Sequence, residues 1–322
     1  MLFSFLMLSC WRSLRASSVV LAATLAAAPA FAQESVEITA APRSVSTILV
    51  KNVPLTARVA LNFERALFLN LGAAERAKLK PFPLIGKANV KSPLLPGGEA
   101  TIRGNFVTVG AAGNKPQRTP TIWINKTINP SEDVVISIFA WPQSRVTVVQ
   151  PSAPAGGQLY LVARDGKEDA DAKIALGGEK IAVVLDMSTA TTVMNARAAV
   201  ALENAGLVRR GKSVGLWVPI PGVSLPVERL IPEAGARLLG LPFKEPFARI
   251  TEARAKELDA LAKAGTSTAT DEEDAIVVTA DKERKRGRGP WISVGQDVLK
   301  YCSRITLDRP GKRWELTCNF PG

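Results

Sequence analysis

Short apolar runs, separated by glycine, proline and polar clusters, recur along most of the chain. Such runs predict a mainly β protein, because strands are short and the turns between them favour Gly, Pro, Asn and Asp. Two breaks in the pattern, at 151–157 and 265–289, are rich in turn-forming or charged residues. We therefore expect two β lobes of similar size, at 33–150 and 158–264, joined by the 151–157 linker.

One helical pattern is clear, at the end of the second lobe. Residues 252–264 are rich in Ala, Leu, Glu and Lys, with Thr251 in front as the expected N-cap and Gly265 just past the end. This helix should close the second lobe, and the charged linker 265–289 follows it.

The N-terminal segment 1–32 predicts a secretory signal peptide. Arg12 and Arg15 precede a mostly apolar stretch that ends in Ala-Phe-Ala at 30–32, which suits signal peptidase. We expect cleavage after Ala32, because the stretch is short for a membrane span; an uncleaved anchor is the alternative. The mature protein would be periplasmic or secreted, with no transmembrane span.

Residues 290–322 predict a small hairpin with a Pro-Gly turn, closed by a disulfide. Cys302 and Cys318 would be the two cysteines left in an oxidising compartment, where a disulfide is expected. Pairing Leu307 with Trp314, and Ile305 with Leu316, puts the apolar residues on one face but leaves the cysteines one residue out of register. Alternatively, Cys302 ends a helical turn through 297–301 that the bridge ties to the last strand.

The composition excludes several kinds of chemistry. The chain has no histidine and three cysteines. Catalytic triads need an imidazole base, and the common zinc sites need imidazoles or several thiolates, so we expect neither, and no metal or cofactor. Carboxylate, hydroxyl, lysine and tyrosine chemistry stays open.

The net charge points to an acidic partner. It is +12 over the whole chain, and in an exported protein this favours anionic envelope components, such as lipid head groups, over nucleic acid. The basic run at 282–288 lacks the aromatic side chains that stack on bases, which favours a solvated linker. In the same linker, 271–274 lacks the ligand spacing of a calcium loop, and 275–280 resembles a TonB-box peptide or is a short β segment.

The two lobes look like copies of each other. Residues 59–74 line up with 183–199 if one residue is inserted. In each segment an apolar strand ends in a polar residue, Asn62 or Asp186. A short loop and a second apolar strand then lead through an asparagine into an Ala-rich helix. Chance similarity between two apolar segments is the alternative.

The segment 181–193, Ile-Ala-Val-Val-Leu-Asp-Met-Ser-Thr-Ala-Thr-Thr-Val, is followed by Ala198-Ala199 and resembles the catalytic strand and loop of retropepsin-like and pepsin-like aspartic proteases. In that family an apolar strand ends in Asp-Thr/Ser-Gly and leads to a small helix. Residues 238–243 resemble the apolar-apolar-Gly segment that closes a lobe, and 135–139 resemble its counterpart in the first lobe. The resemblance implies a two-lobed β fold with an inter-lobe cleft, and acid hydrolysis of peptides by paired aspartates.

The resemblance implies a catalytic role for Asp186, which in the family shares a proton with a second aspartate and activates water. Asn62 takes the partner's position, and an amide cannot accept that proton. Met187 and Ser188 replace the family's Thr/Ser and Gly. With Thr189, these residues are the candidates for lining the cleft. We therefore expect a catalytically degenerate protein that binds an extended peptide or protein ligand.

Other roles stay open. Asp186 and Asn62 could each cap a turn at a strand end. An active aspartic-type peptidase would arise if two copies of Asp186 met in a homodimer, as in the retroviral members of the family. An envelope scaffold without a cleft ligand is a third possibility.

Overall fold

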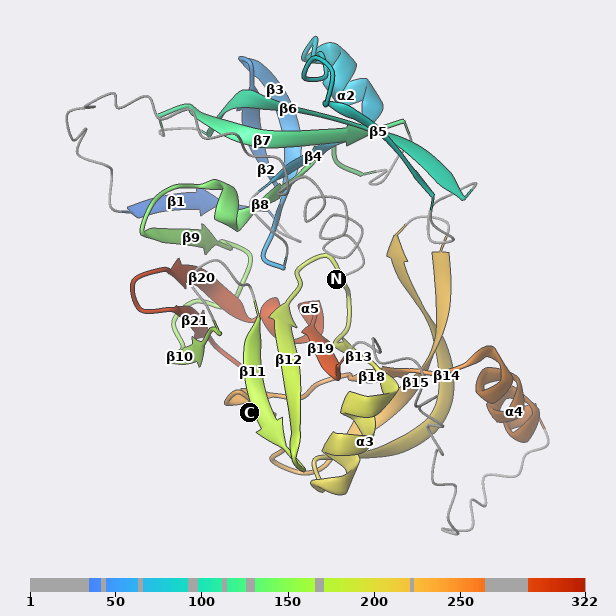
Figure 1. Cartoon of the computed structure of the whole chain (residues 1–322). Coiled ribbons are helices and arrows are strands. Elements are labelled where there is room, and N and C mark those ends of the chain that lie inside the picture. The colour runs from blue at the N-terminus through green and yellow to red at the C-terminus, as the bar shows by residue number, and fades with distance from the viewer. Residues whose placement is uncertain are drawn as a thin grey trace. The chain divides into compact units, whose positions relative to one another are not determined.

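The structure, a computed structural model, describes residues 35–321 except 42–44, 63–65, 92–97, 112–114, 126–130, 166–170, 221–222 and 264–288. The expected signal peptide with its cleavage site, the charged linker up to residue 288 and the segment 275–280 lie outside the described residues. The fold is mainly β, as predicted (Figure 1). Its strands belong to two compact units, one of Met1–Ala170 with Cys302–Asn319 and one of Asp171–Tyr301 with Phe320–Gly322.

The first unit contains a seven-stranded sheet in the order β2-β3-β8-β4-β7-β6-β5. Because β2 also pairs with β6, the first six strands form a closed ring around buried apolar side chains. A helix, α2, follows β4, and a short 3-10 helix, η3, follows β8. The elements are β2 (Val45–Val50), β3 (Val53–Ala60), β4 (Leu67–Leu69), α2 (Leu71–Arg76), β5 (Lys87–Lys91), β6 (Glu99–Ala111), β7 (Gln117–Ile124), β8 (Val134–Ser137) and η3 (Ile138–Ala140).

The second unit also contains a seven-stranded sheet, in the order β11-β12-β19-β13-β18-β15-β14. Helix α3 follows β13, and α5 follows β19. The elements are β11 (Ala172–Leu176), β12 (Glu179–Leu185), β13 (Val193–Met194), α3 (Ala196–Asn204), β14 (Val208–Ile220), β15 (Val223–Pro232), β18 (Phe247–Arg249), α4 (Glu252–Lys263), β19 (Trp291–Val294) and α5 (Gln296–Leu299).

The two seven-stranded sheets have the same topology. Going along the chain, β2 to β8 correspond one by one to β11, β12, β13, β14, β15, β18 and β19, and the corresponding strands take the same places in the sheet order. Every pairing also has the same sense: β8 runs parallel to β3 and antiparallel to β4, as β19 does to β12 and β13. The two seven-stranded sheets are therefore structural repeats, as the sequence similarity predicts.

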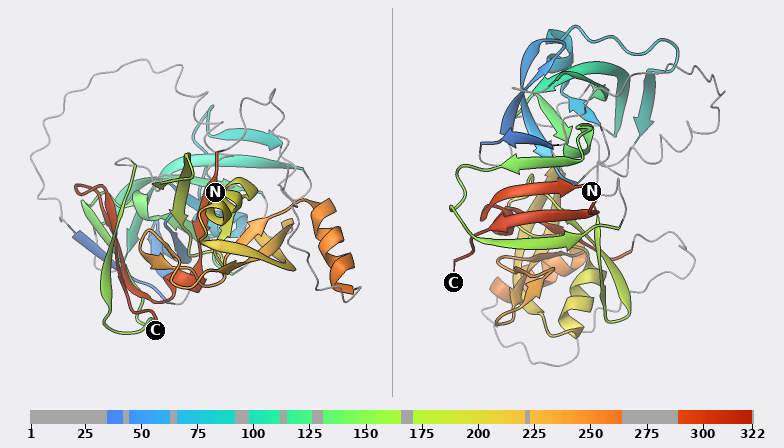
Figure 2. Two further views of the ribbon diagram at one scale, coloured as in Figure 1. Left: turned by 90° about the horizontal axis from the view of Figure 1, so that it is seen from below. Right: turned by 90° about the vertical axis from the view of Figure 1, so that its left-hand side faces the viewer.

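A five-stranded sheet in the first unit is built from segments far apart in the chain. Its order is β1-β9-β20-β21-β10 (Figure 2, right). One face is apolar and fully buried, with Val146, Val148, Ile305, Leu307 and Trp314 in its core. The strands are β1 (Ser35–Thr39), β9 (Arg145–Val149), β10 (Gln158–Ala163), β20 (Cys302–Asp308) and β21 (Arg313–Cys318).

The predicted C-terminal hairpin and its disulfide are confirmed. Leu307 pairs with Trp314 across β20 and β21, and Cys302 is bonded to Cys318. A register shift at Ser303 removes the one-residue conflict, because a bulge lets two residues of one strand oppose one of the other. Helix α5 ends just before Cys302, which begins β20. The bridge therefore closes the hairpin and also ties the end of the helical turn to the last strand.

The strands cross the lobe boundaries that the composition predicts. Residues 158–163, at the start of the expected second lobe, form β10 of the five-stranded sheet. Residues 291–294 form β19 in the middle of the second repeat, and the hairpin 302–318 belongs to the first unit. The hairpin is therefore not a separate appendix, because its apolar face is needed to complete a shared sheet.

The helix predicted at 252–264 is present, but the closing segment predicted at 238–243 is not. The predicted helix is α4, and the hydroxyl of Thr251 accepts a hydrogen bond from the Arg254 N–H, as an N-cap does. The assignment of 238–243 as the closing segment of the second lobe is wrong. Leu238 and Leu241 pair in a separate two-stranded sheet of β16 (Arg237–Leu238) and β17 (Leu241–Pro242), and β19 takes the closing position instead.

Candidate functional site

Asp186 lies directly after β12, where the apolar strand Ile181–Leu185 leaves the core. Its side chain is buried, with 7% of the residue exposed. Its backbone N–H donates to the carbonyl of Val294 at 2.8 Å, which extends the parallel pairing of β12 with β19 by one step. The chain then turns through Met187 and Ser188, so the carboxylate sits at the mouth of a tight loop.

The carboxylate of Asp186 is held by neutral donors from its own unit. Oδ1 accepts hydrogen bonds from the backbone N–H of Ser188, at 2.8 Å, and from the Ser188 hydroxyl. Oδ2 lies 3.4 Å from the hydroxyl of Ser293 on β19. The bond from residue i+2 to a strand-end aspartate is a turn-capping arrangement. Asp186 therefore fixes its loop through both carboxylate oxygens.

The strand registers identify the residue of the first repeat that matches Asp186. The N–H of Asn70 donates to Asp133 O, and the N–H of Asn195 donates to Trp291 O, so these two hydrogen bonds are equivalent. Asp133 is therefore equivalent to Trp291. Three residues further along the chain are Ile136 on β8 and Val294 on β19, which are equivalent to each other.

Ile136 is opposite Val59, and Val294 is opposite Leu185. Val59 is thus equivalent to Leu185, and Ala60 is equivalent to Asp186. The sequence alignment, which matched Asn62 with Asp186, is shifted by two residues.

Ala60 provides no polar group at that position. It is 8% exposed and belongs to an apolar cluster with Ala66 and Phe68. Asn62 lies two residues further along the chain and is half-buried. Neither side chain can act as a proton-sharing carboxylate, so the first repeat lacks the second acid at both candidate positions.

The other predicted site residues surround the Asp186 loop within the second unit. Met187 is buried, and its carbonyl accepts a hydrogen bond from the Gln296 side chain at 3.0 Å. Ser188 is exposed. Thr189 is buried, and its hydroxyl donates to the carbonyl of Asp186. Of the predicted residues, Met187 and Thr189 thus pack inward, and Ser188 presents the loop to solvent.

The strand β19 completes this site and was missed from the sequence. It is followed by Gly295 and then by α5. A Cβ atom on Gly295 would lie 2.4 Å from the carbonyl carbon and oxygen of Thr191, so only glycine fits beside the Asp186 loop. The equivalent residue in the first repeat is Ser137, whose hydroxyl accepts a hydrogen bond from the Phe139 N–H.

Asp297, the second residue of α5, anchors the same loop. Its Oδ1 accepts a hydrogen bond from the Thr192 hydroxyl at 2.9 Å, and its Oδ2 accepts one from the Glu245 N–H at 3.1 Å. Burial raises the pKa of this carboxyl, and these hydrogen bonds partly oppose that rise. Asp297 therefore joins three separate segments of the second unit.

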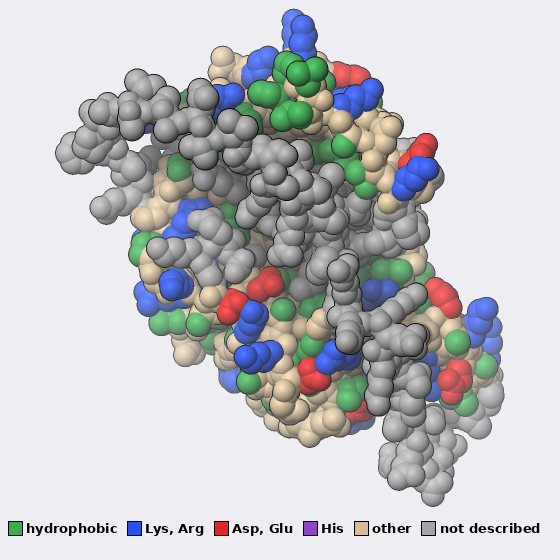
Figure 3. All heavy atoms as spheres, in the orientation of Figure 1, with side chains coloured by type: hydrophobic (Ala, Val, Ile, Leu, Met, Phe, Trp, Pro, Cys, Tyr) green, Lys and Arg blue, Asp and Glu red, His purple; other side chains and the backbone are tan. Residues whose placement is uncertain are grey.

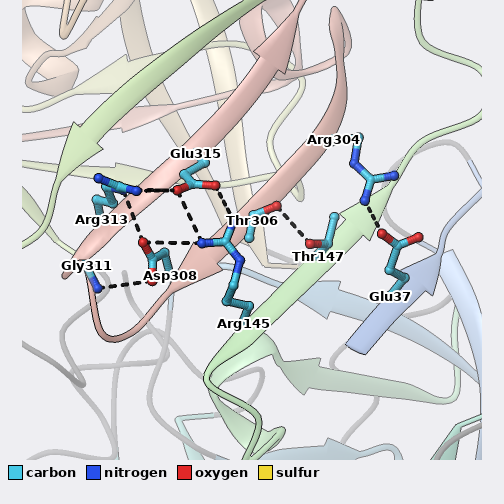
Figure 4. A network of polar contacts seen from close by, with 9 residues as sticks. All are labelled: Glu37, Arg145, Thr147, Arg304, Thr306, Asp308, Gly311, Arg313 and Glu315. Carbon is cyan, nitrogen blue, oxygen red and sulfur yellow. Dashed lines mark hydrogen bonds and ion pairs between the residues drawn. The ribbon is translucent and has the colours of Figure 1, made fainter. Parts of the chain in front are cut away.

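A second polar constellation lies on the five-stranded sheet (Figure 4). Thr147 on β9 and Thr306 on β20 are opposite each other, and their hydroxyls are 2.8 Å apart. Arg145 on β9 reaches across β20 to Glu315 on β21, while Arg304 on β20 reaches across β9 to Glu37 on β1. The two arginines thus make matching contacts on either side of the threonine pair.

At one end of this network, oppositely charged side chains shift each other's pKa values. The hydrogen bond from Arg145 lowers the pKa of Glu315, with help from Arg313, although partial burial opposes it. The same hydrogen bond raises the pKa of Arg145. Asp308 accepts from Arg313 and from the Gly311 N–H, which fixes the turn of the β20–β21 hairpin.

Among the described residues, no group of three or more Cys, Asp or Glu side chains is placed to hold a metal ion. None of the described helices is both long enough and apolar enough to cross a membrane.

Comparisons with known proteins add little. No protein-family model matches the chain, and no curated protein does. Among solved structures, EIAV protease complexed with the inhibitor HBY-793 is similar over 29% of this chain and 79% of that chain, with 14% identity and a TM-score of 0.22. A likeness this weak carries no argument about function.

Proposed function

We propose that this chain is an exported, catalytically degenerate aspartic-protease-like protein that binds an extended peptide without cleaving it. The observation that carries the proposal is that Ala60 in the first repeat takes the position equivalent to Asp186 in the second, according to the strand registers of the two matching sheets. Peptide hydrolysis by this family's chemistry needs two carboxylates that share a proton, so that one removes a proton from water while the other protonates the carbonyl. A methyl group can do neither.

The surroundings of Asp186 support a structural role for its carboxylate. Two donors from Ser188 and one from Ser293 occupy its oxygens. These hydrogen bonds join the carboxylate to its own loop and to β19, as expected of a group that holds the loop in place. The position that holds Thr or Ser in the family is apolar in both repeats, where it is occupied by Met187 and by the equivalent Leu61. Both side chains are fully buried.

The hairpin β14–β15 supports peptide binding by strand addition. Among the described strands, β14 lies at the edge of its sheet and pairs on one side only, with β15. Such an edge strand can pair with an added strand. Its side chains Leu216 and Val218 are 70% and 56% exposed, on the same side of the strand. Exposed aliphatic side chains on an unpaired edge favour an extended ligand with alternating apolar residues.

The charge and the disulfide support the remaining parts of the proposal. The net charge of +12 favours a peptide, or another envelope partner, that is acidic. The bond between Cys302 and Cys318 suits an oxidising compartment, as the N-terminal segment predicts. We propose that the ligand pairs with the edge of β14.

A peptide array tests this proposal. The full chain is incubated with immobilised peptides of randomised sequence, including acidic and basic sets, and the bound protein is measured. We expect retention on acidic peptides with alternating apolar residues, and a loss of at least roughly tenfold in the double variant L216S/V218S. The matched control is L159S/L161S, which removes two similarly exposed leucines from the edge strand β10. Equal loss in both variants, or no retention by the wild type, would argue against a peptide site on β14.

A further inference from the structure

The segment between α2 and β5 exposes large apolar side chains at its tip. Leu84 is 104% exposed, Ile85 is 68% exposed, and Phe82 is 44% exposed. Exposed single apolar residues are common, but three within four positions of one turn form a protruding apolar point. We call residues 82–86 the apolar loop.

Hydrogen bonds and close packing fix the apolar loop to β6. The N–H of Phe82 donates to Gly104 O, and the N–H of Gly104 donates to Gly86 O, both at 2.8 Å. The N–H of Gly86 closes the turn by donating to Phe82 O. A Cβ atom on Gly86 would lie 2.2 Å from Phe82 N, so glycine is required there. The loop is therefore a built turn with its side chains held outward.

The residue at the tip is unfavourable for folding. Leu84 has a φ of 67°, in the left-handed region that favours glycine or asparagine. A leucine in this conformation costs roughly 1–2 kcal/mol, and its fully exposed side chain recovers nothing by packing within the chain. The side chain is better explained by a contact outside the protein.

Lysines surround a pocket beside the apolar loop. The pocket has a volume of about 320 Å³, and Lys51, Lys78 and Lys80 contribute three positive charges to its lining. We call it the lysine pocket. Its other lining residues are neutral: Leu79, Asn105, Phe106, Val107 and Thr108.

The lysine pocket is also well defined by hydrogen bonds. Lys51 Nζ donates to the carbonyl of Lys78, and Asn105 Nδ2 donates to the carbonyl of Lys80. The Asn105 contact holds the segment that leads into the apolar loop against β6, and the Lys51 contact holds it against the turn between β2 and β3. Three ammonium groups without an acidic neighbour in the lining form a site that suits a phosphate-bearing ligand.

We propose that the apolar loop and the lysine pocket together dock this protein on an anionic lipid surface. Leu84, Ile85 and Phe82 would enter the boundary between head groups and acyl chains, and the lysines would bind the head-group phosphates. Apolar side chains at a tip with cations behind them match the layered chemistry of a membrane interface. Figure 3 shows hydrophobic side chains next to both basic and acidic ones at the upper end of the face that it draws.

The charge pattern favours lipid over a protein partner. A protein-binding patch usually buries its apolar residues in a shallow, continuous face with few lysines. Here the apolar side chains stand at a narrow turn, and further exposed lysines, Lys87 and Lys91, follow on β5. Each lysine near an anionic surface adds attraction that salt weakens.

Vesicle flotation tests the inference. The full chain is mixed with vesicles of phosphatidylcholine and phosphatidylglycerol, or of phosphatidylcholine alone, and compared with L84G/I85S. Leu84→Gly suits the backbone at that position, so this variant should fold at least as well as the wild type. We expect it to bind the anionic vesicles roughly tenfold less or weaker still. Because both proteins carry the same N-terminal segment, only the difference between them is read.

A charge arm and two controls complete the experiment. K51Q/K78Q/K80Q should lower binding to anionic vesicles by roughly a hundredfold at low salt, and the loss should shrink as salt is added. K180Q/K256Q/K263Q, which removes three exposed lysines of the second unit, and L261S on α4 should bind like the wild type. Free inorganic phosphate at the same concentration as the lipid should not displace the protein.

Hydrogen exchange localises the contact. Anionic vesicles should protect the amides of residues 79–88 in the wild type, and not in L84G/I85S. Equal flotation of the wild type, L84G/I85S and K51Q/K78Q/K80Q would overturn the inference. Equal binding to neutral and anionic vesicles, or protection only outside residues 79–88, would overturn it as well. Capture of the loop by a protein in place of lipid would overturn it too.

Discussion

The hydroxyls of Thr147 and Thr306 are 2.8 Å apart and lie on equivalent residues of the two repeats. Residues 144–148 read Ser-Arg-Val-Thr-Val, and residues 303–307 read Ser-Arg-Ile-Thr-Leu. Each run follows the helix that ends its own repeat. The two strands pair antiparallel with the threonines directly opposite each other, so a local twofold axis passes between them. The duplication therefore extends into β9 and β20, which pair in the five-stranded sheet of the first unit.

This relationship predicts strong coupling between the two threonines. Each of T147V and T306V leaves one buried hydroxyl without its partner, which should lower the free energy of unfolding by about 1–2 kcal/mol. The double variant should lose less than the sum, because no hydroxyl is then left unpaired. Urea unfolding of the four proteins measures the coupling. Additive losses would show that the pair is not a unit.

The Glu315 network predicts a pH-dependent stability. The pKa of Glu315 is lowered in the folded protein, so its contribution is present above its unfolded value near 4.5 and is lost as pH falls through the lower folded value. E315Q should cost about 1 kcal/mol at neutral pH, since its partner Arg145 is partly exposed. The difference from the wild type should vanish in acid. A difference that stays constant from neutral to acidic pH would contradict this assignment.

Gly295 predicts a steric constraint beside the candidate site. G295A should lower stability by about 1–3 kcal/mol, because its Cβ would overlap the carbonyl of Thr191. The control is G215A on β14, where a Cβ makes contacts of 3.6 Å with Phe247 and Val227. Thermal unfolding of both variants tests the comparison. If G295A melts like G215A, the loop of Asp186 is looser than described.

The disulfide should stabilise the hairpin by constraining the unfolded chain. The bridge spans a sequence separation of 16, and loops of this length contribute about 3 kcal/mol. C302S/C318S should therefore unfold at lower urea concentration, and a reducing agent should shift the wild type but not the variant. A midpoint common to the oxidised wild type and the variant would rule out this contribution.

The local patterns of the sequence predicted much of the fold. The helix at α4, the register of Leu307 with Trp314, and the disulfide each follow from short-range rules on capping, alternation and compartment. The repeat was also visible, because an apolar strand, a polar end and an Ala-rich helix recur in order. These features depend on neighbours in the chain.

The features that depend on distant segments were missed. Leu238-Leu239-Gly240 matches the apolar-apolar-Gly pattern of the family's closing segment. The strand that takes this place in the sheet is β19, which lies between β12 and β13 and follows β12 by more than a hundred residues. The sequence suggested that Asn62 is equivalent to Asp186, because both are polar residues at the end of an apolar strand. The strand registers show instead that Ala60 is equivalent to Asp186. The recurrence of Ser-Arg-x-Thr at 144–147 and 303–306 was the available signal, since it marks the end of each repeat.

Hydrolysis of a mixed peptide library near pH 4, by the wild type and by D186N, tests the central claim most directly. If Asp186 is a structural carboxylate with no acidic partner, neither folded protein cleaves any peptide. Cleavage by the wild type that is abolished in a folded D186N would contradict the account, and would return the chain to the active aspartic peptidases.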